Sequence, residues 1–315
     1  MTVREQVLIT CIHVWDASDE VIPRLEGLGL DVDMPRFDGQ QLDEEDLLPI
    51  IDRYSGILAG DDHLTGRVLE AAKQLRVISK WGIGIDAIDL DAAGKLGIKV
   101  FNTPGVFGDE LADYAMGYLH MLARRQYEVN EKVKKGVWHK VRGTSLAGKT
   151  LGIVGLGSSG RALAHRAAAA SMRVLGFDVV SVPDNPEVEL VELTDLLAKS
   201  DVVSLHLPAT PETRHLINEP ALGLMKPGAW LINTSRGALV DESALVDALR
   251  RGSIGAAALD VFEEEPVSAD NPLLAMENVI VGSHNGSNTF EAVARTTDLA
   301  VENLIKGLEV EDHLD

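Results

Sequence analysis

The sequence predicts an α/β protein built from two doubly wound, parallel-sheet domains, and three observations lead to this prediction. The chain has 315 residues, which is long for a single hydrophobic core. Short apolar runs alternate with longer amphipathic stretches along most of it, as in proteins with parallel sheets. Hydrophobic residues make up 45% of the chain and charged residues 25%, which is typical of globular domains.

The first third of the chain contains four expected strands. Residues 6–12, 55–59 and 76–79 are apolar strand-like runs, and we expect helical stretches between them. Leu90–Leu96 follows as a short helix with Gly97 in the stop position. The fourth strand, 99–102, ends at a Thr-Pro-Gly turn.

The remaining two thirds begin with helices and then alternate strand and helix. Residues 107–125 form a long amphipathic helix, a second helix runs to about Lys135, and a polar turn lies at 143–145. The strand expected at 150–154 is wholly apolar apart from its first residue. Five more strands and a last helix are expected in the following order: 173–178, 202–207, 230–233, 256–261, 279–282 and the helix 289–308.

Charge and cysteine content restrict the classes of partner and compartment. The net charge of −20 argues against nucleic-acid binding, and an anionic substrate would need a local cationic site. The N-terminus lacks the pattern of a secretory signal, and no apolar stretch approaches the length that spans a bilayer. The single cysteine, Cys11, fits a reducing compartment. We therefore expect a cytoplasmic protein with no membrane partner and no metal site.

A glycine-rich loop follows the strand at 150–154 and precedes an Ala-rich helical segment. Its sequence is Gly155-Leu-Gly157-Ser-Ser-Gly160. In a dinucleotide-binding loop of a Rossmann domain, the first glycine permits a tight turn and the second lets the backbone approach a pyrophosphate. The third lets the helix pack closely on the strand. The position between strand and helix therefore predicts a dinucleotide site, with the pyrophosphate at the helix N-terminus.

An acidic residue ends the next expected strand and indicates which dinucleotide is bound. Asp178 lies 18 positions after Gly160, where a carboxylate can bind the ribose hydroxyls. It would repel a 2′-phosphate and no arginine follows it, so NAD is predicted rather than NADP. Ser158 and Ser159 stand where Arg and Ile are frequent, so we expect one charged pyrophosphate contact to be missing.

Three reactive side chains follow the loop, each at the end of an expected strand. They are Arg236, Glu265 and His284. Because loops at the carboxyl ends of parallel strands converge, these side chains can meet beside the nicotinamide. Arg236 suits a substrate carboxylate, His284 suits proton transfer to the carbonyl oxygen, and Glu265 would favour the protonated imidazole. Together they predict the reduction of a 2-keto acid.

At these motifs the chain resembles the D-isomer-specific 2-hydroxyacid dehydrogenase family, particularly the catalytic core of the D-3-phosphoglycerate dehydrogenases. The resemblance covers nearly the whole chain and is carried by residues 77–89, 102–105, 201–208, 225–237, 260–266 and 284–286. It departs at Ser283, where proline is usual, and at Asn285, where an apolar residue is usual. It implies that Arg236, Glu265 and His284 are the catalytic set.

The resemblance also implies a domain division and further contacts. Residues 1–103 with 286–315 would form a flavodoxin-like substrate domain, and 104–285 would form the NAD-binding Rossmann domain, whose helices make a homodimer. Ile83, Gly84 and Arg236 would bind the substrate, and the regulatory C-terminal domains of longer relatives would be absent. Implied cofactor contacts are the loop residues Gly155, Gly157, Ser158, Ser159 and Gly160, with Asp178, Leu207, Pro208, Thr213, Thr234, Ser235, Asp260 and Gly286.

Several alternatives remain open at this stage. Lys80 could bind a substrate phosphate or second carboxylate, or it could be a solvated lysine. A glyoxylate or hydroxypyruvate reductase and a D-lactate-type enzyme are rivals within the family. A cofactor-sensing protein similar to the family's transcriptional corepressors is a rival of another class, which the complete Arg-Glu-His set opposes. Glu265 speaks against the related formate dehydrogenases, which have glutamine there.

Overall fold

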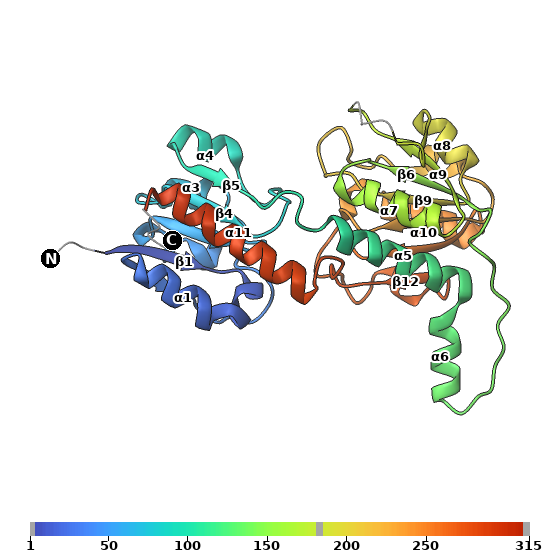
Figure 1. Cartoon of the computed structure of the whole chain (residues 1–315), viewed down its shortest axis with the longest axis horizontal. Coiled ribbons are helices and arrows are strands. Elements are labelled where there is room, and N and C mark those ends of the chain that lie inside the picture. Colours follow the sequence, from blue (N-terminus) through green and yellow to red (C-terminus); the bar gives the residue numbers. More distant parts are fainter. Residues whose placement is uncertain (1–3, 181–184, 311–315) are drawn as a thin grey trace. The chain divides into compact units, whose positions relative to one another are not determined.

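The structure is a computed structural model that describes residues 4–180 and 185–310. Its chain divides into two compact units, Met1–Val106 with Thr289–Asp315, and Phe107–Asn288. Each unit has its own parallel sheet with helices around it, which confirms the predicted α/β class (Figure 1). No described helix has the length and apolar character needed to cross a membrane.

The first unit is a five-stranded parallel sheet of order β2-β1-β3-β4-β5, the flavodoxin-like order. The C-terminal helix α11 returns to this sheet and packs on β3 and β4 (Figure 1). It approaches closely because Gly307 has no side chain, since a Cβ there would lie 2.2 Å from Val77 Cγ2. Its elements are β1 (Glu5–Ile9), α1 (Ser18–Gly27), β2 (Leu30–Asp33), α2 (Glu44–Leu47), β3 (Gly56–Ala59), α3 (Gly66–Ala71), β4 (Val77–Lys80), α4 (Leu90–Leu96), β5 (Lys99–Phe101) and α11 (Phe290–Leu308).

The second unit has a seven-stranded parallel sheet of order β12-β11-β10-β9-β6-β7-β8. The direction of winding reverses between β6 and β9, which is where open α/β sheets bind ligands. Two hydrophobic clusters, one around Leu231 and one around Ile153, are made mainly of strand and helix residues. Its elements are α5 (Gly108–Arg124), α6 (Gln126–Lys134), β6 (Thr150–Val154), α7 (Ser158–Ala169), β7 (Arg173–Phe177), β8 (Glu189–Leu190), α8 (Leu193–Lys199), β9 (Val202–Leu205), α9 (Glu219–Leu224), β10 (Ala229–Asn233), α10 (Glu242–Arg251), β11 (Ile254–Leu259) and β12 (Val279–Val281).

Several local predictions were wrong: the strand expected at 202–207 ends at Leu205, and the strand expected at 256–261 is Ile254–Leu259. The stretch expected to be helical after the first strand contains the edge strand β2, because only Leu30 and Val32 alternate there, too short a pattern to identify. The first strand ends at Ile9 rather than residue 12, since a 3₁₀ helix begins at Ile12. The two-residue edge strand β8 was missed because its side chains are exposed.

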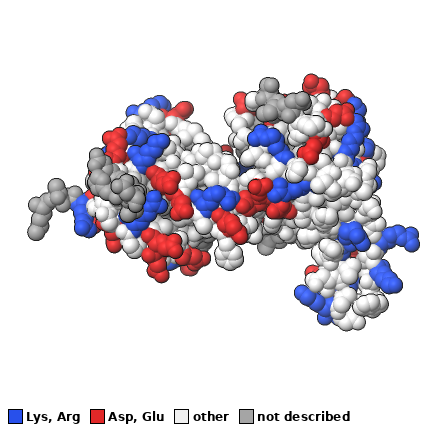
Figure 2. Space-filling model, viewed as in Figure 1, with Lys and Arg blue, Asp and Glu red and all other residues white. Residues whose placement is uncertain are grey.

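Helix α6 and the extended segment after it project from the second unit (Figure 1). None of the α6 residues is buried. Val133, Val137 and Trp138 are exposed there, and Trp138 has 84% of its surface accessible. On the face shown in Figure 2, Lys and Arg side chains gather on this arm, although the whole chain is acidic. Apolar groups on a projecting arm are typical of a segment that packs against another chain.

Candidate active site

The carboxyl ends of β6, β9, β10, β11 and β12 lie at one edge of the second unit's sheet, because all these strands are parallel. The glycine-rich loop follows β6, and the expected reactive residues follow β10, β11 and β12. Residues that are up to 130 positions apart in sequence are thereby brought to one edge. The parallel topology thus brings these loops to the same edge of the sheet, as expected from the sequence.

The three glycines of the loop differ in their surroundings. Gly155 has φ +99, and a Cβ there would lie 2.5 Å from His206 O. A Cβ on Gly160 would lie 2.0 Å from Gly155 O, so close packing of α7 on the loop requires glycine. A Cβ on Gly157, by contrast, would meet no described atom within 4 Å. The backbone at Gly157 therefore borders open space in front of the α7 N-terminus, where a pyrophosphate fits.

Ser159 is fixed by a buried histidine that the sequence reasoning did not single out. His206 follows β9, with Nδ1 3.2 Å from Ser159 Oγ and Nε2 2.9 Å from Ser204 Oγ. Burial lowers the pKa of His206 to about 4, so its ring is neutral at pH 7. His206 therefore braces the glycine loop, while Ser158 is exposed. Only the spatial pairing with Ser159 identifies this histidine.

Asp178 lies just beyond β7 and holds two loops together. Its carboxylate accepts hydrogen bonds from the Leu156 amide at 2.7 Å and the Val180 amide at 2.9 Å. Each carboxylate oxygen can accept a further hydrogen bond, so these contacts leave capacity for ribose hydroxyls. Arg161, which the sequence reasoning did not select, donates from Nη1 to Leu156 O at 2.8 Å. It places a cation at the loop where Ser158 supplies none.

The segments after β9 and β10 complete the cofactor side of the site. Thr213 Oγ1 donates to Pro208 O at 2.8 Å, which closes the turn that begins at Leu207. Ser235 Oγ donates to Leu205 O at 2.7 Å. Thr234 Oγ1 is buried and has no hydrogen-bond partner among residues 4–180 and 185–310. Thr234 follows β10 at the same edge of the sheet as the glycine loop, so its unsatisfied buried hydroxyl fits a bound dinucleotide.

His284 and Glu265 form the expected pair. His284 Nδ1 lies 2.7 Å from Glu265 Oε2, and the two side chains are 36% and 35% exposed. The other carboxylate oxygen accepts from the Phe262 amide at 2.9 Å, which fixes the orientation of Glu265. Because Nδ1 is engaged, Nε2 is the ring nitrogen that can exchange a proton with a substrate.

Asp260 shapes the turn that carries His284. Its buried carboxylate accepts from the Asn285 amide at 3.1 Å and the Gly286 amide at 2.8 Å. The His284 amide donates to Asp260 O at 2.7 Å, and His284 has a left-handed φ of 55°. Asp260 thus holds the histidine turn against β11. The implied contact of Asp260 with the nicotinamide carboxamide stays a prediction.

Arg236 lies next to the loop that carries Glu265. Asn233 Nδ2 donates to Arg236 O at 2.7 Å and closes the turn after β10, while Arg236 Nη1 donates to Ser235 O at 2.7 Å. A Cβ on Gly237 would lie 1.9 Å from Phe262 O, so the two backbones are in direct contact. The second unit therefore gathers Arg236, Glu265 and His284 on adjoining loops.

The expected substrate residues of the first unit lie around the end of β4. The Gly82 amide already donates to Thr103 Oγ1 at 2.9 Å, whereas the amides of Ile83 and Gly84 donate to no described residue. Lys80 is only 6% exposed at its side chain, and its Nζ lies 2.6 Å from Trp81 O and 3.0 Å from Asp61 Oδ1. The two amides are thus available to a substrate, whereas Lys80 is paired.

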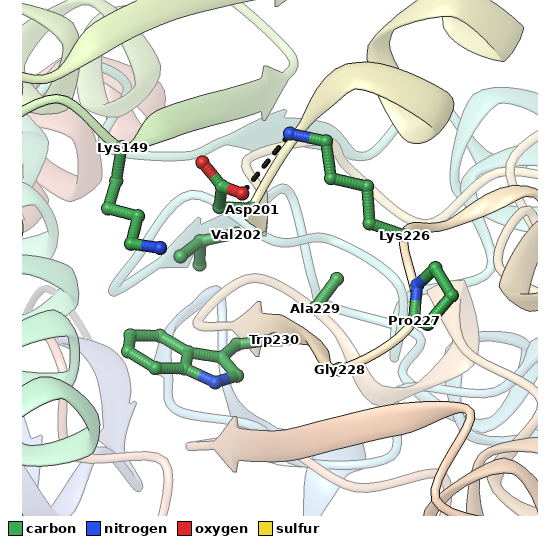
Figure 3. Close-up of a pocket in the computed structure, with 8 residues that line it drawn as sticks. All are labelled: Lys149, Asp201, Val202, Lys226, Pro227, Gly228, Ala229 and Trp230. Carbon is green, nitrogen blue, oxygen red and sulfur yellow. Dashed lines mark hydrogen bonds and ion pairs between the residues drawn. The ribbon is translucent and has the colours of Figure 1, made fainter. Parts of the chain in front are cut away.

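A small hollow of about 160 Å³ lies at the opposite, amino-terminal edge of the second sheet (Figure 3). Lys226 Nζ is 3.1 Å from Asp201 Oδ1, and Asp201 Oδ2 accepts from the Thr150 amide at 2.8 Å. Burial raises the pKa of Asp201, but the Thr150 amide and Lys226 outweigh it, so the pKa lies below its usual value. These contacts tie the starts of β6 and β9 together. The lining residues are Lys149, Asp201, Val202, Lys226, Pro227, Gly228, Ala229 and Trp230.

Known proteins share both the sequence and the fold. Residues 116–286 match the model of the D-isomer specific 2-hydroxyacid dehydrogenase, NAD binding domain. A glyoxylate reductase of Thermofilum pendens is 42% identical over 278 residues, covering 85% of this chain and 82% of the relative. A D-3-phosphoglycerate dehydrogenase of Methanocaldococcus jannaschii is 40% identical over 85% of this chain but only 52% of its own length.

A solved structure extends the similarity to nearly the whole chain. The D-lactate dehydrogenase of Aquifex aeolicus, solved with NAD and lactic acid, has a TM-score of 0.84 and 31% identity over 94% of this chain and 93% of its own. The open glycine loop, Asp178 and the buried Thr234 hydroxyl fit NAD as the cofactor. The chain belongs to the D-isomer specific 2-hydroxyacid dehydrogenase family, and it is an NAD-dependent oxidoreductase that acts on CH–OH groups.

Proposed function

We propose that this enzyme interconverts a small D-2-hydroxy acid and its 2-keto acid, with His284 as the proton donor and acceptor. The observation that carries the proposal is the 2.7 Å contact between His284 Nδ1 and Glu265 Oε2, because a carboxylate in this position orients the imidazole and favours its protonated form. Bound NADH supplies the hydride for carbon 2. A complete acid–base pair favours an enzyme over a cofactor-sensing protein, which needs no proton donor.

The residues of the chain divide the remaining tasks. Arg236 binds the substrate carboxylate through its planar guanidinium, which suits a bidentate contact. In the first unit, the amides of Ile83 and Gly84 donate to no described residue, which supports the substrate role that the family resemblance implies for them. His284 transfers the Nε2 proton to the carbonyl oxygen as the keto acid is reduced, and Glu265 stabilises the protonated ring. In the oxidation direction, neutral His284 takes the hydroxyl proton.

We further propose that the substrate is an unphosphorylated acid such as glyoxylate or hydroxypyruvate. The positive charge of Lys80 is balanced by Asp61 at 3.0 Å, and its ammonium also donates to Trp81 O. A phosphate would have to displace Asp61 and would meet a negative field from the chain, whose net charge is −20. The relative from Thermofilum pendens, a glyoxylate reductase, supports this choice.

The test compares NADH oxidation with glyoxylate, hydroxypyruvate, pyruvate and 3-phosphohydroxypyruvate. We expect the highest kcat/KM with glyoxylate or hydroxypyruvate, and a higher kcat/KM with 3-phosphohydroxypyruvate in Asp61→Asn, which releases Lys80. Asp52→Asn, an exposed aspartate in the same unit, is the matched control. A preference of the wild type for 3-phosphohydroxypyruvate would overturn the substrate proposal. If the wild type reduced none of the four acids, the proposed keto-acid reductase activity would be contradicted.

We also propose that the chain acts as a homodimer in the cytoplasm. The exposed apolar arm around Trp138 supports the dimer, since it would be covered by a second copy. The single cysteine, Cys11, is buried and burial raises its pKa to about 12, so it is an unreactive thiol suited to a reducing compartment. Light scattering should show a dimer that Trp138→Ser weakens, while Phe290→Ser, at another exposed aromatic residue, should not. A monomeric wild type would refute the dimer.

A further inference from the structure

A second histidine–glutamate pair lies in the loop that carries Glu265. Glu263, two positions before Glu265, forms an ion pair with His215 through Oε1 and Nε2. Both side chains are about one-third exposed, so solvent reaches the pair but does not surround it. Neither residue was selected from the sequence. The pair joins the segment after β9 to the segment after β11.

His215 also contacts the chain that follows Arg236. Its amide donates to Ala238 O at 2.8 Å, and the Ile217 amide donates to Leu239 O at 3.0 Å. His215 has a left-handed φ of 50°, a conformation that non-glycine residues seldom adopt without support from neighbouring contacts. Ala238 lies two positions after Arg236, so His215 contacts two of the three loops of the catalytic set.

Glu263 is held from a second side. Its amide donates to Glu242 Oε1 at 2.6 Å, and the other oxygen of Glu242 accepts from Asn271 Nδ2 at 2.8 Å. Glu242 lies in the first turn of α10, so this anchor belongs to a helix packed in the hydrophobic core. His215 is the hydrogen-bond partner of the acidic pair that Glu242 and Glu263 form at this point. Without it, neighbouring carboxylates would repel one another.

We propose that His215 and Glu263 are positioning residues that hold the Glu265 loop against the Arg236 loop, and so keep Glu265 within reach of His284. The direct contact of Gly237 with Phe262 brings the two loops together, and the His215–Glu263 pair ties their far side. The proposal rests on the proposed function of Glu265 and His284. A displacement of a catalytic group by about 1 Å can lower the rate by up to about a hundredfold. Loss of the His215–Glu263 contact should therefore have a measurable effect on the rate.

The test uses His215→Gln, Glu263→Gln and the double variant, with the best keto acid of the wild type. Each single change should lower kcat for reduction about tenfold. The double change should cost no more than either one, because each breaks the same pair. The KM for NADH and the NADH dissociation constant, measured by fluorescence, should stay within about twofold of the wild type. His165→Gln is the control, since His165 forms an exposed pair with Glu187 in the same unit.

The pH profile separates positioning from general loss of structure. Since the Glu265 carboxylate favours protonated His284, loosening the loop should move the alkaline limb of keto-acid reduction to lower pH. A lower kcat with an unmoved limb, additive losses in the double variant, or wild-type kinetics would each overturn the proposal. Glu263→Asp, which keeps the charge, should recover part of the rate if a glutamine variant fails to fold. An inactive wild type would instead refute the proposed function, so the two failures are distinguishable.

Discussion

Replacing Glu265 by glutamine removes the negative charge beside the proton donor and keeps the shape of the side chain. In the structure, Oε1 accepts from the Phe262 amide and Oε2 lies 2.7 Å from His284 Nδ1. A glutamine can keep the first contact through its oxygen. Its NH₂ group then faces Nδ1 as a donor, which a protonated imidazole cannot accept. The variant therefore destabilises the protonated ring specifically.

The size of the effect follows from the contact and its exposure. A hydrogen bond to a charged group contributes about 1.5–3 kcal/mol. Because both side chains are about one-third exposed, solvent reduces the value to its lower end, about 1.5 kcal/mol. That energy corresponds to about tenfold in the population of protonated His284 and about one pH unit. At pH values above the alkaline limb of the wild type, keto-acid reduction by Glu265→Gln should therefore fall by about tenfold, and below that limb the loss should be smaller.

The sign of the pH effect differs between the two directions of the reaction. Reduction needs the protonated imidazole, so its alkaline limb should move about one unit lower in Glu265→Gln. Oxidation of the hydroxy acid needs the neutral imidazole, so its acid limb should also move lower and extend activity into acid solution. Steady-state kcat/KM is measured in both directions from pH 5 to 9, with Glu264→Gln as the neighbouring exposed control. Two limbs that coincide with those of the wild type would refute the role of Glu265.

Three further predictions concern Arg236, which binds the substrate carboxylate, and the residues of the cofactor site. Arg236→Lys should raise KM for the keto acid by about tenfold or more, because a point charge replaces a bidentate fork, and should leave NADH affinity unchanged; an unchanged KM contradicts it. Asp178→Ala should lower the ratio of NAD to NADP use, and should also lower Tm because the Leu156 and Val180 amides lose their acceptor. A constant ratio would remove Asp178 from cofactor selection. Gly157→Ala should weaken NADH binding with little change in Tm, whereas Gly155→Ala should lower Tm itself, and equal Tm losses would contradict the assigned roles.

Local sequence patterns were sufficient for the parallel-sheet fold and for the cofactor loop. Buried strands such as β6 and β9 are mostly apolar runs, and the glycine-rich loop has a strand before it and a helix after it. The edge strands β2 and β8 escaped because they bury few side chains, so their sequence has little hydrophobic pattern. Hydrophobic sequence patterns therefore identify strands whose side chains are buried and miss strands whose side chains are exposed.

The side chains that brace the site could not be found in the same way. His206 and Ser159 are 47 positions apart, and His215 and Glu263 are 48 apart, so no spacing rule links them. Each histidine is one of nine in the chain, and its partner is decided only when strands from different parts of the chain are paired. Arg236, Glu265 and His284 could be named because each lies in a loop after a recognisable strand and because together they resemble a known family. Their supporting residues have no such motif.

Lys80 forms an ion pair with Asp61, and this pairing bears on which substrate the enzyme can bind. From the sequence, Lys80 directly before the glycine loop at 82–84 was equally consistent with an anion receptor and with a solvated side chain. In the structure the ammonium is not solvated: it is buried and faces Asp61 and the Trp81 carbonyl. A buried lysine without a partner would be costly, so Asp61 stabilises Lys80 and at the same time cancels the charge that a phosphate would need. A substrate with one carboxylate needs no second cation besides Arg236, and this is the reason for our proposal of a small, unphosphorylated keto acid.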